Sequence, residues 1–89
     1  MPTVVFTPAL HRFLPAPAAR AMGSTVAAAL ADVFASRPAL RGYVLDDQGA
    51  VRRHVAIFVN GAPLADRASL SDAVDPADEI YVFQALTGG

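Results

Sequence analysis

The sequence contains no cysteine and no lysine, and each absence excludes some chemistry. Without cysteine, no disulfide can stabilise the fold and no thiolate is available for metal binding or nucleophilic catalysis. Without lysine, the chain cannot be extended by isopeptide bonds to itself. The missing lysine has two interpretations: an activated carboxyl terminus meets no amine on its own carrier, or arginine replaces lysine throughout. We favour the second, because a compositional bias is weak evidence for a mechanism.

Net charge and long apolar runs are also scarce. The formal net charge is −1, and Arg52-Arg53 is too short for a basic patch, so nucleic acid is not an expected partner. The apolar stretches are too short to span a bilayer, and the N-terminus lacks the layout of a signal peptide. We therefore expect one cytoplasmic domain with no membrane partner. Its hydrophobic residues, 54% of the chain, must supply the stability.

Residues suited to catalysis or metal binding are few and scattered. His11 and His54 are the only histidines, and without cysteine they make a poor metal site. Asp46-Asp47 and Asp78-Glu79 are adjacent pairs, whose side chains do not face each other, and no nucleophile or base accompanies them. We expect no catalytic residue and no metal in this chain.

The carboxyl end is the most informative feature that is present. Thr87-Gly88-Gly89 comes directly after a strand-like run from Glu79 to Ala85. Glycine has no Cβ, so such an end can lie in a narrow slot, and nothing bulky shields its carbonyl carbon from attack. A chain end without need of this freedom gains only entropy cost from two glycines. The pattern predicts a flexible tail over residues 86–89 that serves as a chemical handle.

The first half of the chain predicts two strands and a helix. Thr3 to Thr7 alternates, with Val4 and Phe6 on one face, and Ala18 to Met22 is a short second strand. The residues between these strands, Leu10 to Pro17, predict a turn or irregular edge. A helix then begins at its N-cap Thr25 and ends at Arg37-Pro38, with one apolar stripe formed by Val26, Leu30, Val33 and Phe34.

The second half predicts a hairpin and a final strand. Arg53 to Val59 is the clearest strand, and Asn60-Gly61 turns it into a short return strand, Ala62 to Ala65. The last strand is Glu79 to Ala85, which follows a turn at residues 75–78. Two further segments are predicted. Leu40 to Val51 is connecting material with an acidic turn at residues 46–49, and Leu70 to Val74 is a single helical turn.

This order of elements predicts an α+β domain over residues 1–85. The domain is a mixed sheet of four to five strands with one main helix packed on one face. A helix that crosses between early and late strands favours parallel pairing of the first and last strands in the sheet centre.

Three aromatic residues fall on one face of the predicted strands. Phe58, Tyr81 and Phe83 lie opposite the set that the helix should cover, which is Val55, Ile57, Ile80 and Val82. Exposed together, the three rings would form a partner surface. The alternative is a register shifted by one residue, which would place the rings in the core.

Taken together, these pieces resemble the MoaD/ThiS family of ubiquitin-like, β-grasp sulfur carriers. The resemblance lies in the hairpin strand His54 to Gly61, the turn and strand Asp78 to Phe83, and the end Ala85 to Gly89, and it covers the whole chain in order and length. Gln84-Ala85 departs from the consecutive prolines of some molybdopterin-synthase small subunits. The connection from Leu40 to Arg53 is more similar to carriers that serve cysteine biosynthesis.

The resemblance implies a mechanism and a set of partners. A ubiquitin-activating-type enzyme would use ATP to adenylate the Gly89 carboxylate, and sulfur from a donor would replace AMP to give a thiocarboxylate for a sulfur-accepting synthase. Gly88 would provide steric clearance, and Leu86 and Thr87 would guide the tail into the partner. The carrier would bind no cofactor itself, and its acceptor would belong to molybdopterin, thiamin, cysteine or tRNA biosynthesis.

Two other functions remain open at this point. The activated end could be attacked by a lysine of another protein, which would make the chain a ubiquitin-like modifier. Alternatively, the chain could be a noncovalent β-grasp adaptor that binds a partner through its exposed sheet face and makes no use of its tail.

Overall fold

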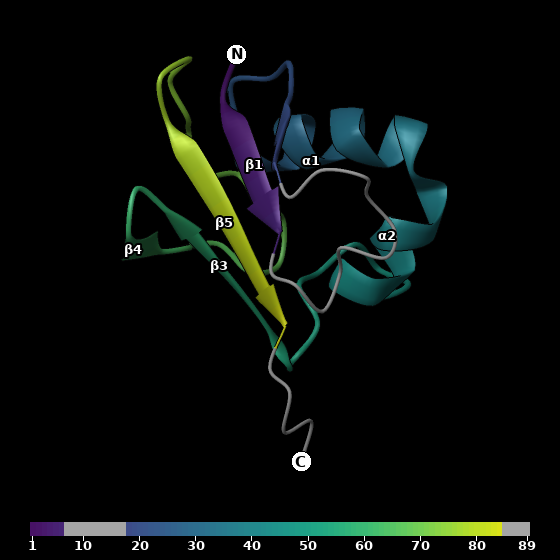
Figure 1. Cartoon of the computed structure of the whole chain (residues 1–89). Helices are drawn as coiled ribbons and strands as arrows, with labels where there is room; N and C mark the ends of the chain where they lie inside the picture. Colours follow the sequence, from purple (N-terminus) through teal and green to yellow (C-terminus); the bar gives the residue numbers. More distant parts are fainter. Residues whose placement is uncertain (7–17, 85–89) are drawn as a thin grey trace.

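Five strands and two helices form the described part of the chain, residues 1–6 and 18–84, in the computed structural model (Figure 1). In chain order they are β1 (Thr3–Phe6), β2 (Ala18–Arg20), α1 (Val26–Ser36), α2 (Pro38–Val44), β3 (Val55–Val59), β4 (Ala62–Pro63) and β5 (Glu79–Gln84). The strands form one sheet in the order β2-β1-β5-β3-β4. Strands β1 and β5 run parallel at its centre and the other neighbours are antiparallel, so the predicted mixed sheet is confirmed.

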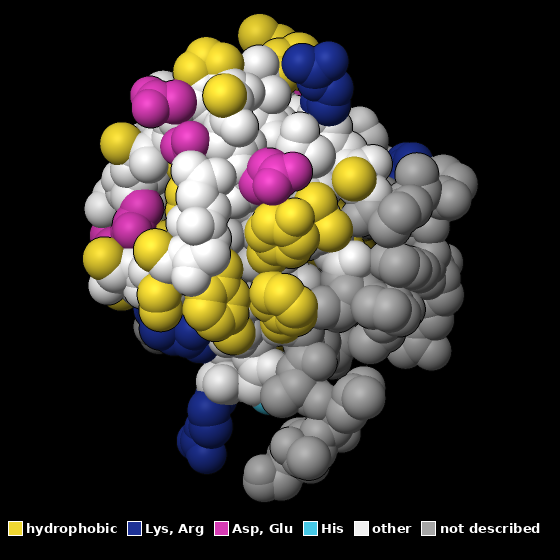
Figure 2. Space-filling model, turned by 60° about the vertical axis from the view of Figure 1, so that its left-hand side comes forward, with side chains coloured by type: hydrophobic (Ala, Val, Ile, Leu, Met, Phe, Trp, Pro, Cys, Tyr) yellow, Lys and Arg dark blue, Asp and Glu magenta, His cyan; other side chains and the backbone are white. Residues whose placement is uncertain are grey.

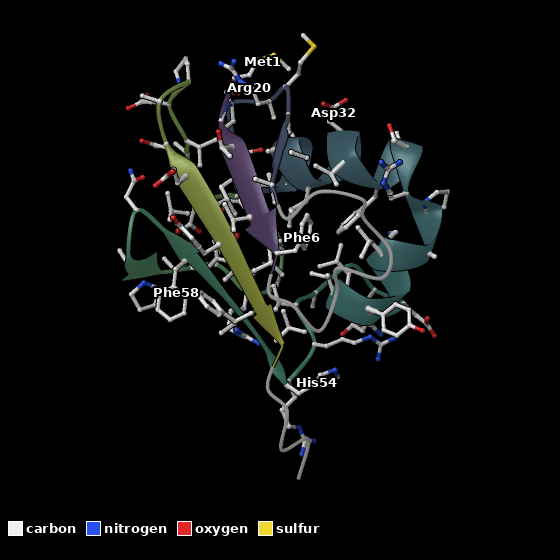
Figure 3. All side chains as sticks on the ribbon, viewed as in Figure 1. Met1, Phe6, Arg20, Asp32, His54 and Phe58 are labelled. Carbon is white, nitrogen blue, oxygen red and sulfur yellow. The ribbon has the colours of Figure 1, made fainter. Side chains whose placement is uncertain are left out.

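Both helices cover the same face of the sheet, and the opposite face carries no helix in the described part (Figure 1). Strand alternation decides which side chains lie between the layers. Val55 and Ile57 of β3 and Ile80 and Val82 of β5 are buried, as predicted, and so are Val4 and Phe6, which share one face of β1. In Figure 3, Phe6 points toward the helices, whereas Phe58 of β3 lies on the opposite side of the sheet.

Helix α1 begins and ends where the sequence predicts. The Thr25 hydroxyl accepts the Ala28 N–H at 3.1 Å, which satisfies one of the free donors of the first turn. The helix ends at Ser36, before Arg37 and Pro38, because the residue preceding proline is pushed out of helical angles. Its predicted stripe is buried against the sheet and consists of Val26, Leu30, Val33 and Phe34.

Helix α2 corrects the prediction that Leu40 to Val51 is only connecting material. Pro38 stands in its first turn, where a missing N–H leaves no hydrogen bond unmade. Leu40 and Val44, four positions apart, are fully buried and anchor the helix. Gly42 in its interior weakens the helical signal, and for this reason sequence alone pointed to a connection.

The predicted helical turn at Leu70 to Val74 is wrong. A single turn lies earlier in the chain, closed by the Leu70 N–H, which donates to the Asp66 carbonyl at 2.9 Å. The Asp66 carboxylate draws this turn together by accepting N–H groups from the residues that follow it. Leu70 then adopts φ 53°, and the chain continues extended, with Ala73 bridging to Thr25.

The hairpin is confirmed, with shorter strands than predicted. Asn60 and Gly61 have φ of 51° and 85°, the left-handed angles that a two-residue turn requires. Strand β3 begins at Val55 rather than Arg53, and β4 ends at Pro63 rather than Ala65. The segment Leu10 to Pro17, Thr7 and Ala85 lie outside the described residues. In the part of the chain that is described, neither helix is long and apolar enough to cross a membrane.

Candidate functional site

The helix-free face of the sheet brings the three predicted aromatic residues together. The ring centroids of Phe58 and Phe83 are 5.6 Å apart with edge-to-face geometry, and those of Tyr81 and Phe83 are 6.2 Å apart and stacked. Phe83 is 42% exposed, and Phe58 and Tyr81 are half-buried. The register is therefore the predicted one, because a shift by one residue would have placed all three rings in the core.

Strand pairing extends this cluster into an apolar row across the whole sheet. Residues paired between neighbouring strands share a face. Tyr81 pairs with Phe58 on one side and Val5 on the other, Phe58 pairs with Pro63, and Val5 pairs with Ala18. We call the set Ala18, Val5, Tyr81, Phe58 and Pro63 the apolar row; it holds one residue from each strand.

Phe83 and Ala56, paired across β5 and β3, continue the apolar surface toward the end of β5. A shallow hollow of about 320 Å³ lies against Phe58, Gly61, Tyr81 and Phe83. Figure 2 shows hydrophobic side chains gathered at the centre of this face, with acidic side chains beside and above them. An apolar surface of this kind, rimmed by polar groups, is typical of a site for another protein.

On the other side of the apolar row the face is polar. Thr3 pairs with Arg20 of β2 and with Glu79 of β5, and Asn60 lies next to Glu79. We call Arg20, Thr3, Glu79 and Asn60 the polar row. Both charged side chains are exposed, and neither forms an ion pair with another described residue.

A network of hydrogen bonds fixes the start of β5 beneath this row. The Asn60 amide donates to Asp78 Oδ1 at 2.8 Å and accepts the Glu79 N–H at 2.9 Å. The other Asp78 oxygen accepts the Asp75 N–H at 2.8 Å. The Asp75 N–H first, and the Asn60 amide second, hold the pKa of Asp78 below its ordinary value, because both bonds favour the charged carboxylate.

The remaining residues that the sequence analysis singled out are those of the tail, the two histidines and the acidic pair Asp46-Asp47. Leu86, Thr87, Gly88 and Gly89 lie outside the described residues, and so does His11. His54 is half-buried in the turn before β3, and Asp46 closes its own turn by accepting the N–H groups of Gln48 and Ala50. Within residues 1–6 and 18–84, no cluster of acidic or histidine side chains is placed to hold a metal ion.

The members of the two rows that sequence reasoning missed include Val5, Ala18, Pro63 and Arg20. Alternation along β1 gives the face of Val5, whereas β2 and β4 are too short for alternation to assign Ala18, Arg20 and Pro63 to a face. Only the pairing register, however, shows that they align with Tyr81 and Glu79. A signal existed in the predicted parallel pairing of the first and last strands, which already places β1 beside β5.

One family model matches most of this sequence. The model of the ThiS family matches residues 14–89. No curated protein matches the sequence significantly.

Solved structures with the same arrangement cover nearly the whole chain. A chain of the Amycolatopsis orientalis BexX/CysO complex superposes with a TM-score of 0.88 at 20% identity, covering 100% of both chains. SAMP1 from Haloferax volcanii gives 0.82 at 25% identity over 99% of this chain and 98% of its own. CysO from Mycobacterium tuberculosis gives 0.85 at 22% identity over 97% and 100%. These likenesses confirm the predicted β-grasp, ubiquitin-like fold.

Proposed function

The chain belongs to the ThiS family, and on that premise we propose that it is a sulfur carrier whose Gly89 carboxylate is adenylated by a partner enzyme and converted to a thiocarboxylate. The observation that supports this most is the family match itself, because it runs through the Gly88-Gly89 end on which the chemistry depends. The carrier catalyses nothing in this scheme.

Activation of the carboxylate is a chemical necessity. A terminal carboxylate is anionic at neutral pH and a poor electrophile. Attack by its oxygen on the α-phosphate of ATP releases pyrophosphate and gives a mixed anhydride with AMP as leaving group. Hydrosulfide supplied by a sulfur donor then attacks the carbonyl carbon, displaces AMP and loses its proton. The resulting thiocarboxylate can pass its sulfur to an acceptor in cofactor, amino-acid or tRNA biosynthesis.

The aromatic surface supplies what the tail alone cannot. We propose that Phe58, Tyr81 and Phe83 dock on the adenylating enzyme while Leu86 and Thr87 guide the tail toward ATP. Strand β5 carries two of these rings and ends at Gln84, one residue before the tail, so both contacts lie on one continuous segment. Two linked contacts bind more tightly than either one, because the second binding step is intramolecular.

The proposal is tested by intact-mass spectrometry of the protein from its native host. A mass gain equal to replacement of one carboxyl oxygen by sulfur is expected on Gly89. Deletion of Gly88 and Gly89 should abolish that gain and also ATP–pyrophosphate exchange by the adenylating enzyme of the same organism. An unmodified terminus together with unchanged exchange after the deletion would contradict the proposal.

A second candidate is a ubiquitin-like protein modifier. The similar SAMP1 structure from Methanosarcina acetivorans is described as a small archaeal modifier protein, and the fold is shared. In that case the activated Gly89 would be attacked by a lysine of another protein. High-mass adducts joined through Gly89 to lysine distinguish it from the carrier. A noncovalent adaptor would instead keep its binding after the two glycines are removed.

A further inference from the structure

The apolar residues of the helix-free face form a row, and the direction of this row relative to the strands limits what can bind there. The apolar row runs across the strands rather than along them, with one residue on each of five strands. Neighbouring strands are about 4.8 Å apart, so the row is about 19 Å long. A partner segment that contacts most of it must therefore present apolar side chains along a stripe of about that length.

An amphipathic α-helix meets this requirement. About 13 residues of helix span 19 Å at 1.5 Å per residue, and a helix with its side chains is about 10 Å wide. A helix laid along the apolar row reaches toward the residues that flank it, because Phe83 and Glu79 each lie about 7 Å from Tyr81 along β5. An extended strand fits less well, because its alternate side chains would point away from the sheet.

The charges on the polar row define the partner further. Arg20 lies on β2 and Glu79 on β5, both paired to Thr3 of the strand between them. They are therefore two strand spacings apart, about 10 Å. Positions i and i+7 of a helix are separated by about 10.5 Å and lie on the same side. A basic residue above Glu79 thus places an acidic residue seven positions away above Arg20.

A second copy of the chain is a weaker occupant. A stable homodimer buries about 800 Å² on each partner. On this face Phe83 is 42% exposed, whereas Phe58 and Tyr81 are half-buried, so the three rings offer little free apolar area to a second copy. The surface suits a contact that is supplemented elsewhere, such as a partner that also holds the tail.

We propose that the helix-free face accepts an amphipathic α-helix of a partner protein, lying across the strands, with an arginine or lysine over Glu79 and an aspartate or glutamate seven positions away over Arg20. Arg20 and Glu79 are the specificity residues of this surface. The inference rests on the proposed function only in taking the partner to be a protein, and its test involves neither ATP nor Gly89.

The test uses two stapled helical peptides of identical composition and net charge. Both carry the same apolar stripe. The first has arginine at position i and glutamate at i+7 along the flank that meets the polar row, and the second has these two exchanged. Titration into ¹⁵N-labelled protein is followed by NMR. The first peptide is expected to shift the amide signals of Val5, Tyr81 and Glu79 and to bind about tenfold more tightly than the second.

A charge-exchanged protein provides the matched control. The double variant Arg20→Glu/Glu79→Arg keeps the net charge and should prefer the second peptide by a similar factor. Asp47→Arg, in the turn after α2, should leave the preference unchanged. Equal affinity for both peptides, a preference that the double variant does not reverse, shifts confined to α1 and α2, or no binding of either peptide would each overturn the proposal. A failure to form thiocarboxylate would refute the sulfur-carrier proposal and leave this result unaffected.

Discussion

The side-chain amide of Asn60 ties the β3–β4 hairpin to the start of β5, a segment 18 residues later, by donating to Asp78 Oδ1 at 2.8 Å. The same amide accepts the Glu79 N–H at 2.9 Å, and the Asn60 backbone N–H donates to the Glu79 carbonyl at 2.9 Å. Asn60 also adopts φ 51°, an angle that asparagine tolerates better than most residues. One residue thus shapes the turn and also fixes Glu79 at the edge of the partner surface.

Substitutions at Asn60 separate these two roles. Asn60→Gly keeps the left-handed angle accessible but removes both side-chain hydrogen bonds, so we expect a loss of about 1–2 kcal/mol in the free energy of unfolding. Asn60→Ala should lose about 1 kcal/mol more, because alanine is strained at this angle. Urea unfolding of the three proteins measures both steps. A glycine variant as stable as the parent would show that the hydrogen bonds contribute nothing.

Acid should weaken the fold through two carboxylates. Bonds from Ser71 and Ser69 hold the pKa of Asp66 below the ordinary value of 3.8, and bonds from Asp75 and Asn60 do the same for Asp78. A depressed native pKa means that the unfolded chain binds more protons in this range, so stability falls as the pH drops through and below 3.8.

Urea midpoints measured from pH 7 to pH 3 test this expectation. The midpoint should stay nearly constant in the upper part of the range and fall in the lower part. The variant Asp66→Asn should be less stable at pH 7 and less sensitive to acid, because asparagine does not titrate. A parent whose midpoint does not change between pH 5 and pH 3 would contradict the linkage.

Sequence patterns predicted most of the sheet because each strand carries its own signal. Alternation assigned Val55, Ile57, Ile80 and Val82 to the covered face, and Asn60-Gly61 located the hairpin. Helix α2 could not be predicted in the same way. It is short, it contains Gly42, and burial of Leu40 and Val44 by the rest of the domain stabilises it. Tertiary packing of this kind overrides local propensity.

The candidate site was predictable in part for a similar reason. Phe58, Tyr81 and Phe83 follow from alternation within two strands. Arg20 opposite Thr3 and Glu79 depends on pairing between strands that are distant in sequence, which no local pattern contains. The roles of Gly88 and Gly89 remain predictions from the sequence and the family.

Substitution by alanine should have opposite effects on stability at two of the glycines. A Cβ on Gly23 would lie 2.6 Å from the Ala29 nitrogen and 2.8 Å from the Ala28 Cβ, so Gly23→Ala should displace the start of α1 and destabilise the protein. A Cβ on Gly42 would meet nothing within 4 Å, and Gly42→Ala should stabilise α2 by about 0.5–1 kcal/mol. Thermal unfolding compares the two, and a stabilised Gly23→Ala would contradict the close approach of Gly23 to the first turn of α1.

The strand register of β5 predicts which of its side chains serve the fold and which serve the partner. Phe83 is 42% exposed, so Phe83→Arg should change the free energy of unfolding by only about 0.5 kcal/mol, while adenylation by the cognate enzyme becomes weaker. Ile80 is fully buried, and Ile80→Ala should cost about 2–5 kcal/mol through the cavity that it leaves.

Urea unfolding and ATP–pyrophosphate exchange, measured on the same preparations, separate these effects. Without urea, the folded fraction of Ile80→Ala should be adenylated with the parental KM, because its surface rings are intact. The KM of the adenylating enzyme for the Phe83→Arg carrier should rise, because a charge in the docking surface must lose its water when the partner binds. Phe58→Arg should behave like Phe83→Arg. Unfolding of both arginine variants would place the rings in the core and refute the docking surface, whereas folded variants with a parental KM would refute its role in adenylation.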